Sequence, residues 1–292
     1  MWTRLLHPAV DGDGIADPVL TLTSIILLLR PFDVWWVTPF VLALACLSLV
    51  FRSVRRAPMT WLLLAVLVAA RIVVVWPLSD NHIYLLSYWC LAIGLALSSQ
   101  TPAATLATSG RWMVGAAFAM AVLWKIMSPD YLDGRFFRVT LLTDERFADA
   151  SLVLGGLPRD QMAENRKFLE PLPEGAQLLD PPAFVEPPRL RALAAAATWG
   201  GLVLEALVAL LCLMPVAGRI EVVRHAAMLM FCATTYALAP VAGFGWLIAT
   251  LGLAQCLPSQ PRLRGAYISV FLLIVLYSEI PWIGVLADWT AN

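Results

Sequence analysis

The sequence predicts an all-α membrane protein: a polytopic transmembrane helical bundle of about eight spans with one extracytoplasmic cap insertion. Of the 292 residues, 60% are hydrophobic and only 14% are charged, and the apolar residues fall into long runs. A soluble domain carries nearly twice that charge, so lipid is the natural solvent for the excess of apolar side chains. The formal net charge is zero, which argues against a nucleic-acid partner.

Eight apolar segments have the length of a membrane-spanning helix, which needs about 20 residues. An earlier run at 18–29 is too short to span alone, so we interpret it as an interfacial or re-entrant helix, with a ninth span as the alternative. The chain then divides into an N-terminal extracytoplasmic or interfacial segment (1–33), spans one to four (34–127), the cap (128–190) and spans five to eight (191–292). The eight segments are 34–51, 59–78, 83–99, 108–127, 192–216, 224–239, 241–257 and 266–286.

Arginines in the short loops orient these spans. Loops 52–58, 100–111, 217–224 and 258–265 contain arginine, whereas the alternate loops at 79–82 and 240–243 contain no lysine or arginine. Because basic loops stay on the cytoplasmic side, we expect these four loops at one face, and both termini and the cap at the other. Long loops of this kind are usually lids or binding elements, so we expect a small-molecule or protein partner at the outer face, besides membrane lipid.

Cysteine and histidine placement argues against a metal site. The five cysteines all lie within apolar stretches, and the three histidines fall at opposite membrane levels under this topology. Such cysteines are typical packing residues, and zinc sites need three or four ligands at one place. The CxxC, HExxH, GxGxxG and GxSxG patterns are absent as well, so we predict no metal and no nucleotide-binding loop.

Ionisable residues inside the apolar segments are the candidate functional residues, because charge is costly in lipid. In one interpretation Arg71 is structural and pairs with Glu205 or Glu279 to hold the bundle together. The same three residues, at mid-membrane positions, also suggest a transporter, although no internal repeat accompanies them. The full set is Arg71, His82, Lys125, Glu205, His225 and Glu279.

Lys125 and His82 lie at the same outer level on adjacent predicted spans. Their structural interpretations are that Lys125 extends its amine to the outer headgroups and that His82 caps a helix start. His225 would be an inner-surface residue. The alternative is catalytic, because an amine and an imidazole at a membrane mouth can share a proton-transfer task.

Two motifs resemble a known family. SDNHIYLL (79–86) opens the third span and AVLWKIMSPDYLDG (121–134) closes the fourth. They resemble the asparagine–histidine start and the lysine-plus-aspartate-aromatic turn of the HTTM (horizontally transferred transmembrane) family, the bacterial relatives of vitamin K-dependent γ-carboxylase. The resemblance covers roughly residues 20–257 at the level of span order, and Glu205 and His225 look like further family positions.

The resemblance implies a membrane enzyme at the outer face of the bacterial cytoplasmic membrane, acting on a quinol or another membrane-soluble substrate. By motif, Lys125 would be the catalytic base and His82 its helper, and reduced quinone would be the cofactor. Asn81, Asp130 and Tyr131 would bind substrate or position the lysine, with Arg71 nearby. No segment resembles the carboxylase's large soluble β-rich portion, so glutamate carboxylation is not expected. The non-enzymatic alternative is a membrane component that binds lipid or a partner through the 128–190 cap.

Overall fold

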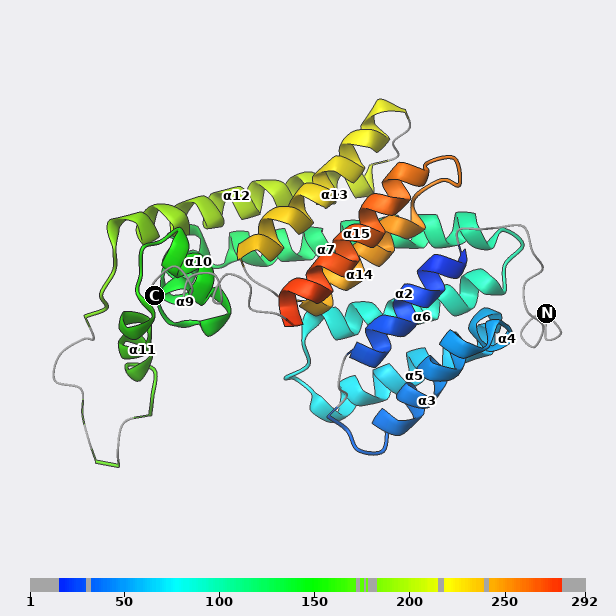
Figure 1. Ribbon diagram of the computed structural model, residues 1–292, viewed down its shortest axis with the longest axis horizontal. Helices are drawn as coiled ribbons and strands as arrows, with labels where there is room; N and C mark the ends of the chain where they lie inside the picture. The colour runs from blue at the N-terminus through cyan, green and yellow to red at the C-terminus, as the bar shows by residue number, and fades with distance from the viewer. Residues whose placement is uncertain are drawn as a thin grey trace.

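The structure is a computed structural model that describes residues 16–29, 33–171, 174–175, 177, 183–214, 218–238 and 242–279; within these ranges the fold is helical and has no strand. Figure 1 shows a bundle of long helices and, under the first part of one of them, a group of shorter helices. The bundle helices are α2 (Ala16–Leu29), α3 (Thr38–Val50), α5 (Pro58–Val75), α6 (Asn81–Leu97), α7 (Pro102–Met127), α12 (Pro188–Leu213), α13 (Arg219–Leu238), α14 (Ala242–Ala254) and α15 (Pro261–Glu279), and the short α4 (Arg52–Arg56) joins α3 to α5.

Each of the eight predicted segments overlaps one of these helices, so the prediction of an all-helical fold is confirmed for the described residues. Proline marks several of their starts: α5 begins at Pro58, α7 at Pro102 and α12 at Pro188. The first helical position suits proline because its missing N–H would have no partner there and its backbone angle is already helical.

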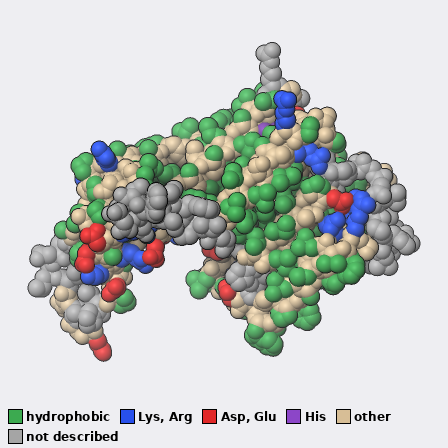
Figure 2. All heavy atoms as spheres, viewed as in Figure 1, with side chains coloured by type: hydrophobic (Ala, Val, Ile, Leu, Met, Phe, Trp, Pro, Cys, Tyr) green, Lys and Arg blue, Asp and Glu red, His purple; other side chains and the backbone are tan. Residues whose placement is uncertain are grey.

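Among the described residues, three helices, α5, α7 and α12, are long and apolar enough to cross a membrane, which indicates an integral membrane protein. Apolar side chains point outward from them, including the exposed Val66, Val73 and Val203, and Figure 2 shows hydrophobic side chains over much of the visible face of the bundle. The helices α3 and α14 have 13 residues each, or about 20 Å, against about 30 Å of hydrocarbon. Eight spans therefore stay a prediction.

The helix α2 lies inside the bundle, packed against α3 and α14, and not on its surface. Its Val19, Leu20 and Leu27 are fully buried, so an interfacial position does not fit 18–29, while the re-entrant helix and the ninth span stay predictions. The Asp17 carboxylate at its start binds the Arg56 guanidinium at 2.9 and 2.7 Å. The start of α2 thus lies beside loop 52–58. Segment 1–33 was predicted outside the cytoplasm and loop 52–58 on the cytoplasmic side of the membrane, and these two predictions cannot both hold.

The arginine-bearing loops gather at one end of the bundle, which we call the arginine end. Arg111 of α7 donates to the carbonyl of Met214, just after α12, at 3.4 Å. The Gln260 amide, just before α15, donates to Glu221 of α13 at 3.3 Å. The loops predicted to share one face are therefore neighbours in the fold, while the side of a membrane on which they lie stays a prediction.

The cap follows α7 at the opposite end of the bundle. It has regular structure, because four short α-helices and one helical turn cover much of it. Leu141, Leu142, Leu157 and Met162 of the cap form a small core with the first two turns of α12, so the cap reaches past residue 190 into α12. Its elements are α8 (Pro129–Leu132), α9 (Arg135–Thr143), η1 (Glu145–Phe147), α10 (Ala148–Val153) and α11 (Arg159–Lys167).

Candidate functional site

The candidate site is an ion pair between α7 and α12, where the bundle meets the cap. The Lys125 amine lies 2.5 Å from one carboxylate oxygen of Glu205, and their side chains are only 24% and 12% exposed. The two helices approach closely because Gly115 has no side chain: a Cβ there would lie 2.8 Å from Leu213. Since the helices run antiparallel, Lys125 after Gly115 and Glu205 before Leu213 come to the same level.

Tyr131 forms the third side of this site. The helix α7 ends at Met127, and the short α8 turns back so that the Lys125 amine lies 5.1 Å from the centre of the Tyr131 ring, a distance at which cation–π attraction operates. The Tyr131 hydroxyl donates to the Thr198 carbonyl of α12 at 3.3 Å. Burial and the nearby Glu205 carboxylate raise the pKa of Tyr131 above its ordinary value, so the phenol stays protonated as a hydrogen-bond donor.

The Glu205 carboxylate is only half satisfied. One oxygen accepts from Lys125, and the other is buried without a hydrogen-bond partner in the part of the chain that the structure describes. A buried carboxylate oxygen without a partner costs about 1–3 kcal/mol or more. Such an atom beside a partly accessible amine is typical of a site that holds a ligand or moves a proton.

His82 and Asn81 lie apart from this pair, at the start of α6. The His82 imidazole lies 3.9 Å from Asp80 of the same turn, and Asn81 is exposed. His82 is 15 residues before the end of α6, whereas Lys125 is 23 residues after the start of α7. In this antiparallel pair Lys125 therefore lies about 12 Å further along the axis, and the Lys125–His82 pairing stays a prediction that the described contacts do not support.

Two of the other predicted residues have different partners from those expected. Arg71 is buried and lies 3.5 Å from Asp33, while Glu205 binds Lys125, so the predicted pairing of Arg71 with Glu205 or Glu279 stays a prediction that the described contacts do not support. Asp130 is exposed and lies 3.4 Å from Arg135 of the cap, away from the Lys125 amine, whereas the neighbouring Tyr131 does contact it. The side chain of Glu279 falls outside the described residues.

His225 lies at the arginine end and is buried, with 2% of the residue exposed. Its Nδ1 is 2.8 Å from the Tyr267 hydroxyl, and its Nε2 is 4.0 Å from Glu221. The interpretation of His225 as an inner-surface residue is therefore wrong, because packing against α15 buries it. Together the candidate residues form two separate groups, one at each end of the bundle.

No family model, curated protein or solved structure matches the chain. The likeness to the HTTM family therefore rests on the two sequence motifs alone and stays a prediction. The Lys125–Glu205 pair rests on the structure.

The sequence analysis did not predict the Lys125–Glu205 ion pair, although one feature of the sequence indicates it. Only Lys125 and Lys167 among the 20 basic residues are lysines, and the rest are arginines. A lone lysine in an apolar helix needs an opposite charge, and Glu205 is the comparable acid in an apolar helix. The 80 residues between them hide the contact, because nothing local in the sequence sets the register of α7 against α12.

Proposed function

We propose that this chain is a membrane enzyme in which Lys125 and Glu205 take a proton from a quinol or another membrane-soluble hydroxyl compound. The observation that carries the proposal is the pair itself: a mostly buried amine and carboxylate in contact, with the second carboxylate oxygen lacking a partner among the described residues. The resemblance of the Lys125 motif to that of a family in which the lysine is a base supports the same role.

The chemistry needs only one proton shared by two groups. When the proton of the ammonium passes to Glu205, Lys125 becomes a neutral amine and Glu205 a neutral acid. The amine then accepts the hydroxyl proton of the substrate, which leaves as the oxyanion while Lys125 becomes charged again. The proton on Glu205 passes to water, and one turnover releases one proton and one oxyanion. The neighbouring phenol of Tyr131 stays protonated and offers its ring to the cation.

The surroundings of Lys125 suit a substrate that arrives through lipid. The last turns of α7 expose Leu123, Trp124, Ile126 and Met127, and exposed apolar surface next to a polar group is typical of a site open to the bilayer. Tyr131 of the cap covers one side of the amine. We expect a hydroxyl compound dissolved in the membrane to approach the amine from the side that Tyr131 leaves open.

Oxygen uptake by menadiol, a reduced naphthoquinone, tests the proposal. The menadiol anion reacts with oxygen faster than the neutral quinol, and the reaction of one quinol with one O2 gives one quinone and one hydrogen peroxide. Purified protein in liposomes should accelerate quinone formation. Lys125→Met should lower that acceleration about a hundredfold, because general-base catalysis contributes 10²–10⁴-fold.

Lys167→Met is the matched control, since Lys167 is the other lysine and lies on the exposed face of α11, paired with Glu164. It should keep the full rate. Equal rates in Lys125→Met and Lys167→Met would show that the Lys125–Glu205 pair is structural. If the unaltered protein does not accelerate quinone formation, quinols are not its substrates.

A further inference from the structure

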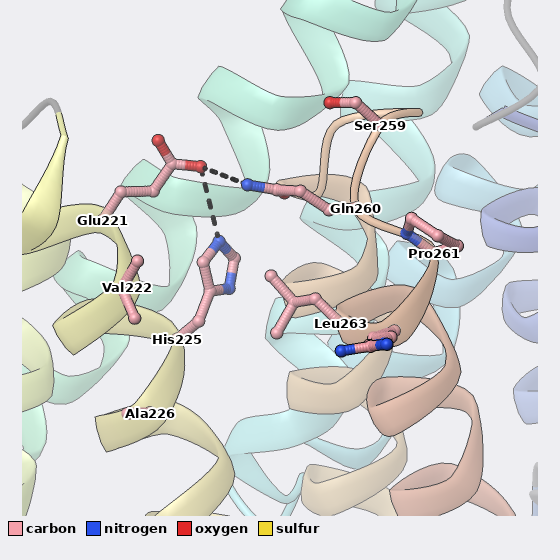
Figure 3. A pocket seen from close by; sticks show the side chains of 9 residues that line it. Glu221, Val222, His225, Ala226, Ser259, Gln260, Pro261 and Leu263 are labelled. Carbon is pink, nitrogen blue, oxygen red and sulfur yellow. Dashed lines mark hydrogen bonds and ion pairs between the residues drawn. The ribbon is translucent and has the colours of Figure 1, made fainter.

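A pocket of about 540 Å³ opens at the arginine end, between the start of α13 and the loop that joins α14 to α15. This volume lies in the range of small-molecule sites. Figure 3 shows Glu221 and His225 of α13 on one side of the pocket and Gln260 and Leu263 on the other. Because the pocket lies at the other end of the bundle from the Lys125–Glu205 pair, a ligand bound in it is independent of the proposed function.

The neighbours of the His225 ring fix the position of its proton. The Tyr267 hydroxyl lies 2.8 Å from Nδ1 and 3.8 Å from the sulfur of Met228. A thioether is a weak acceptor, so the hydroxyl donates to Nδ1, and the proton of the neutral ring lies on Nε2. Nε2 is buried and has no hydrogen-bond partner among the described residues, and it faces Glu221 in the pocket.

The His225 imidazole and the Glu221 carboxylate are close enough for one oxygen atom to join them. The 4.0 Å from Nε2 to the carboxylate oxygen is too long for a hydrogen bond, and Nε2 is buried, so an oxygen can lie about 2.8 Å from each only when the Glu221 side chain, which is 25% exposed, moves aside. Gln260 donates to the same carboxylate at 3.3 Å, which keeps Glu221 at the wall of the pocket. The bridging oxygen must accept from the imidazole N–H and donate to the carboxylate, and a hydroxyl group does both.

The other residues that line the pocket favour a ligand whose hydroxyl group is attached to an apolar body. Val222, Ala226, Pro261 and Leu263 form most of the walls. Ser259 and Arg262 complete the lining. An anion bound at Nε2 would be repelled by the Glu221 carboxylate 4.0 Å away, and an ammonium group there would direct its N–H bonds at the N–H of the imidazole. We propose that this pocket binds an amphipathic molecule with a single hydroxyl on an apolar body, of the phenol class, and that His225 and Glu221 bridge that hydroxyl.

Fluorine NMR with three matched probes tests the proposal on the full chain in nanodiscs. The probes are para-trifluoromethylphenol, its methyl ether para-trifluoromethylanisole, and para-trifluoromethylbenzylamine. The phenol should bind saturably, and the ether about tenfold or more weakly, because it has no proton for the charged acceptor. Glu221→Met should weaken the phenol by a similar factor and remove its advantage over the ether. Glu164→Met, a glutamate of the cap, is the matched control and should bind as the unaltered chain does.

Two further variants keep the outcome decisive. Folded Lys125→Met should keep the part of the saturable phenol binding that Glu221→Met removes, which assigns that part to this pocket. Tyr267→Phe releases Nδ1 and lets the imidazole proton move, so the preference for phenol over ether should shrink even if Glu221→Met fails to fold. Equal binding of phenol and ether by the unaltered chain, or tighter binding of the amine, overturns the proposal, as does phenol binding that disappears in Lys125→Met.

Discussion

Replacing Lys125 with methionine isolates the contribution of the candidate site to stability. Methionine keeps most of the apolar length of lysine and removes its charge. Glu205, 12% exposed, would lose its described partner while its second oxygen already lacks one. Breaking a buried ion pair costs 3–5 kcal/mol, and because the lysine is partly exposed we expect a loss of about 3 kcal/mol in the free energy of unfolding.

The double variant Lys125→Met with Glu205→Gln separates the interaction energy between the two side chains from the cost of each single substitution. Glu205→Gln alone leaves an ammonium group that reaches water, so its cost is smaller, about 1 kcal/mol. Lys125→Met with Glu205→Gln contains no unpaired charge and should be more stable than Lys125→Met alone. The resulting coupling energy should be about 2 kcal/mol, within the range for side chains in direct contact.

Chemical unfolding in mixed micelles, followed by tryptophan fluorescence, measures all four proteins of this cycle. Lys167→Met, at an exposed pair in the cap, should change stability by about 0.5 kcal/mol or less. If the two single changes prove additive to within about 0.5 kcal/mol, the two side chains do not interact in the folded protein. The proposed proton transfer would then lose its structural basis.

Three other changes test separate parts of the fold. Gly252→Ala would place a Cβ against the fully buried Tyr267 ring. It should lower the stability measured by thermal unfolding by about 3 kcal/mol, because the core becomes overpacked. The control Gly200→Ala, whose Cβ would have no neighbour within 4 Å, should not lower the stability. Asp17→Asn removes the carboxylate that binds the arginines beside α4 and should cost about 2 kcal/mol in the same assay. The cap arginines lower the pKa of Glu186, so its stabilising contribution is present at neutral pH and is lost as the pH falls below the ordinary glutamate range; Glu186→Gln should flatten the pH dependence of the melting temperature there.

The sequence predicted the helices of the bundle well, because their signals are local. Long apolar runs and prolines such as Pro58, Pro102 and Pro188 mark where helices begin. The same local signals left residues 18–29 open between an interfacial or re-entrant helix and a ninth span, because the helix formed there has only 14 residues. Its burial comes from α3 and α14, and no pattern within α2 shows which helices will cover it.

The candidate site was predicted only in part for a related reason. Lys125 and Tyr131 are six residues apart, and their contact follows from the turn between α7 and α8. Glu205 reaches Lys125 only through the packing of α7 on α12, which depends on the close approach at Gly115. His82 and Lys125 seemed level because their predicted spans had similar lengths, whereas α7 has 26 residues and α6 has 17.

The helix α12 ties the two parts of the molecule together. Leu190 and Ala194 near its start belong to the small core of the cap, while Val208 and Cys212 near its end belong to the core of the bundle. Glu205 lies between these regions on the same continuous helix. A force that displaces the cap is therefore transmitted along the backbone of α12 to the carboxylate that holds the Lys125 amine. The ion pair lies where binding at the cap and packing in the bundle both act on it, a position that suits a functional group better than a purely structural one.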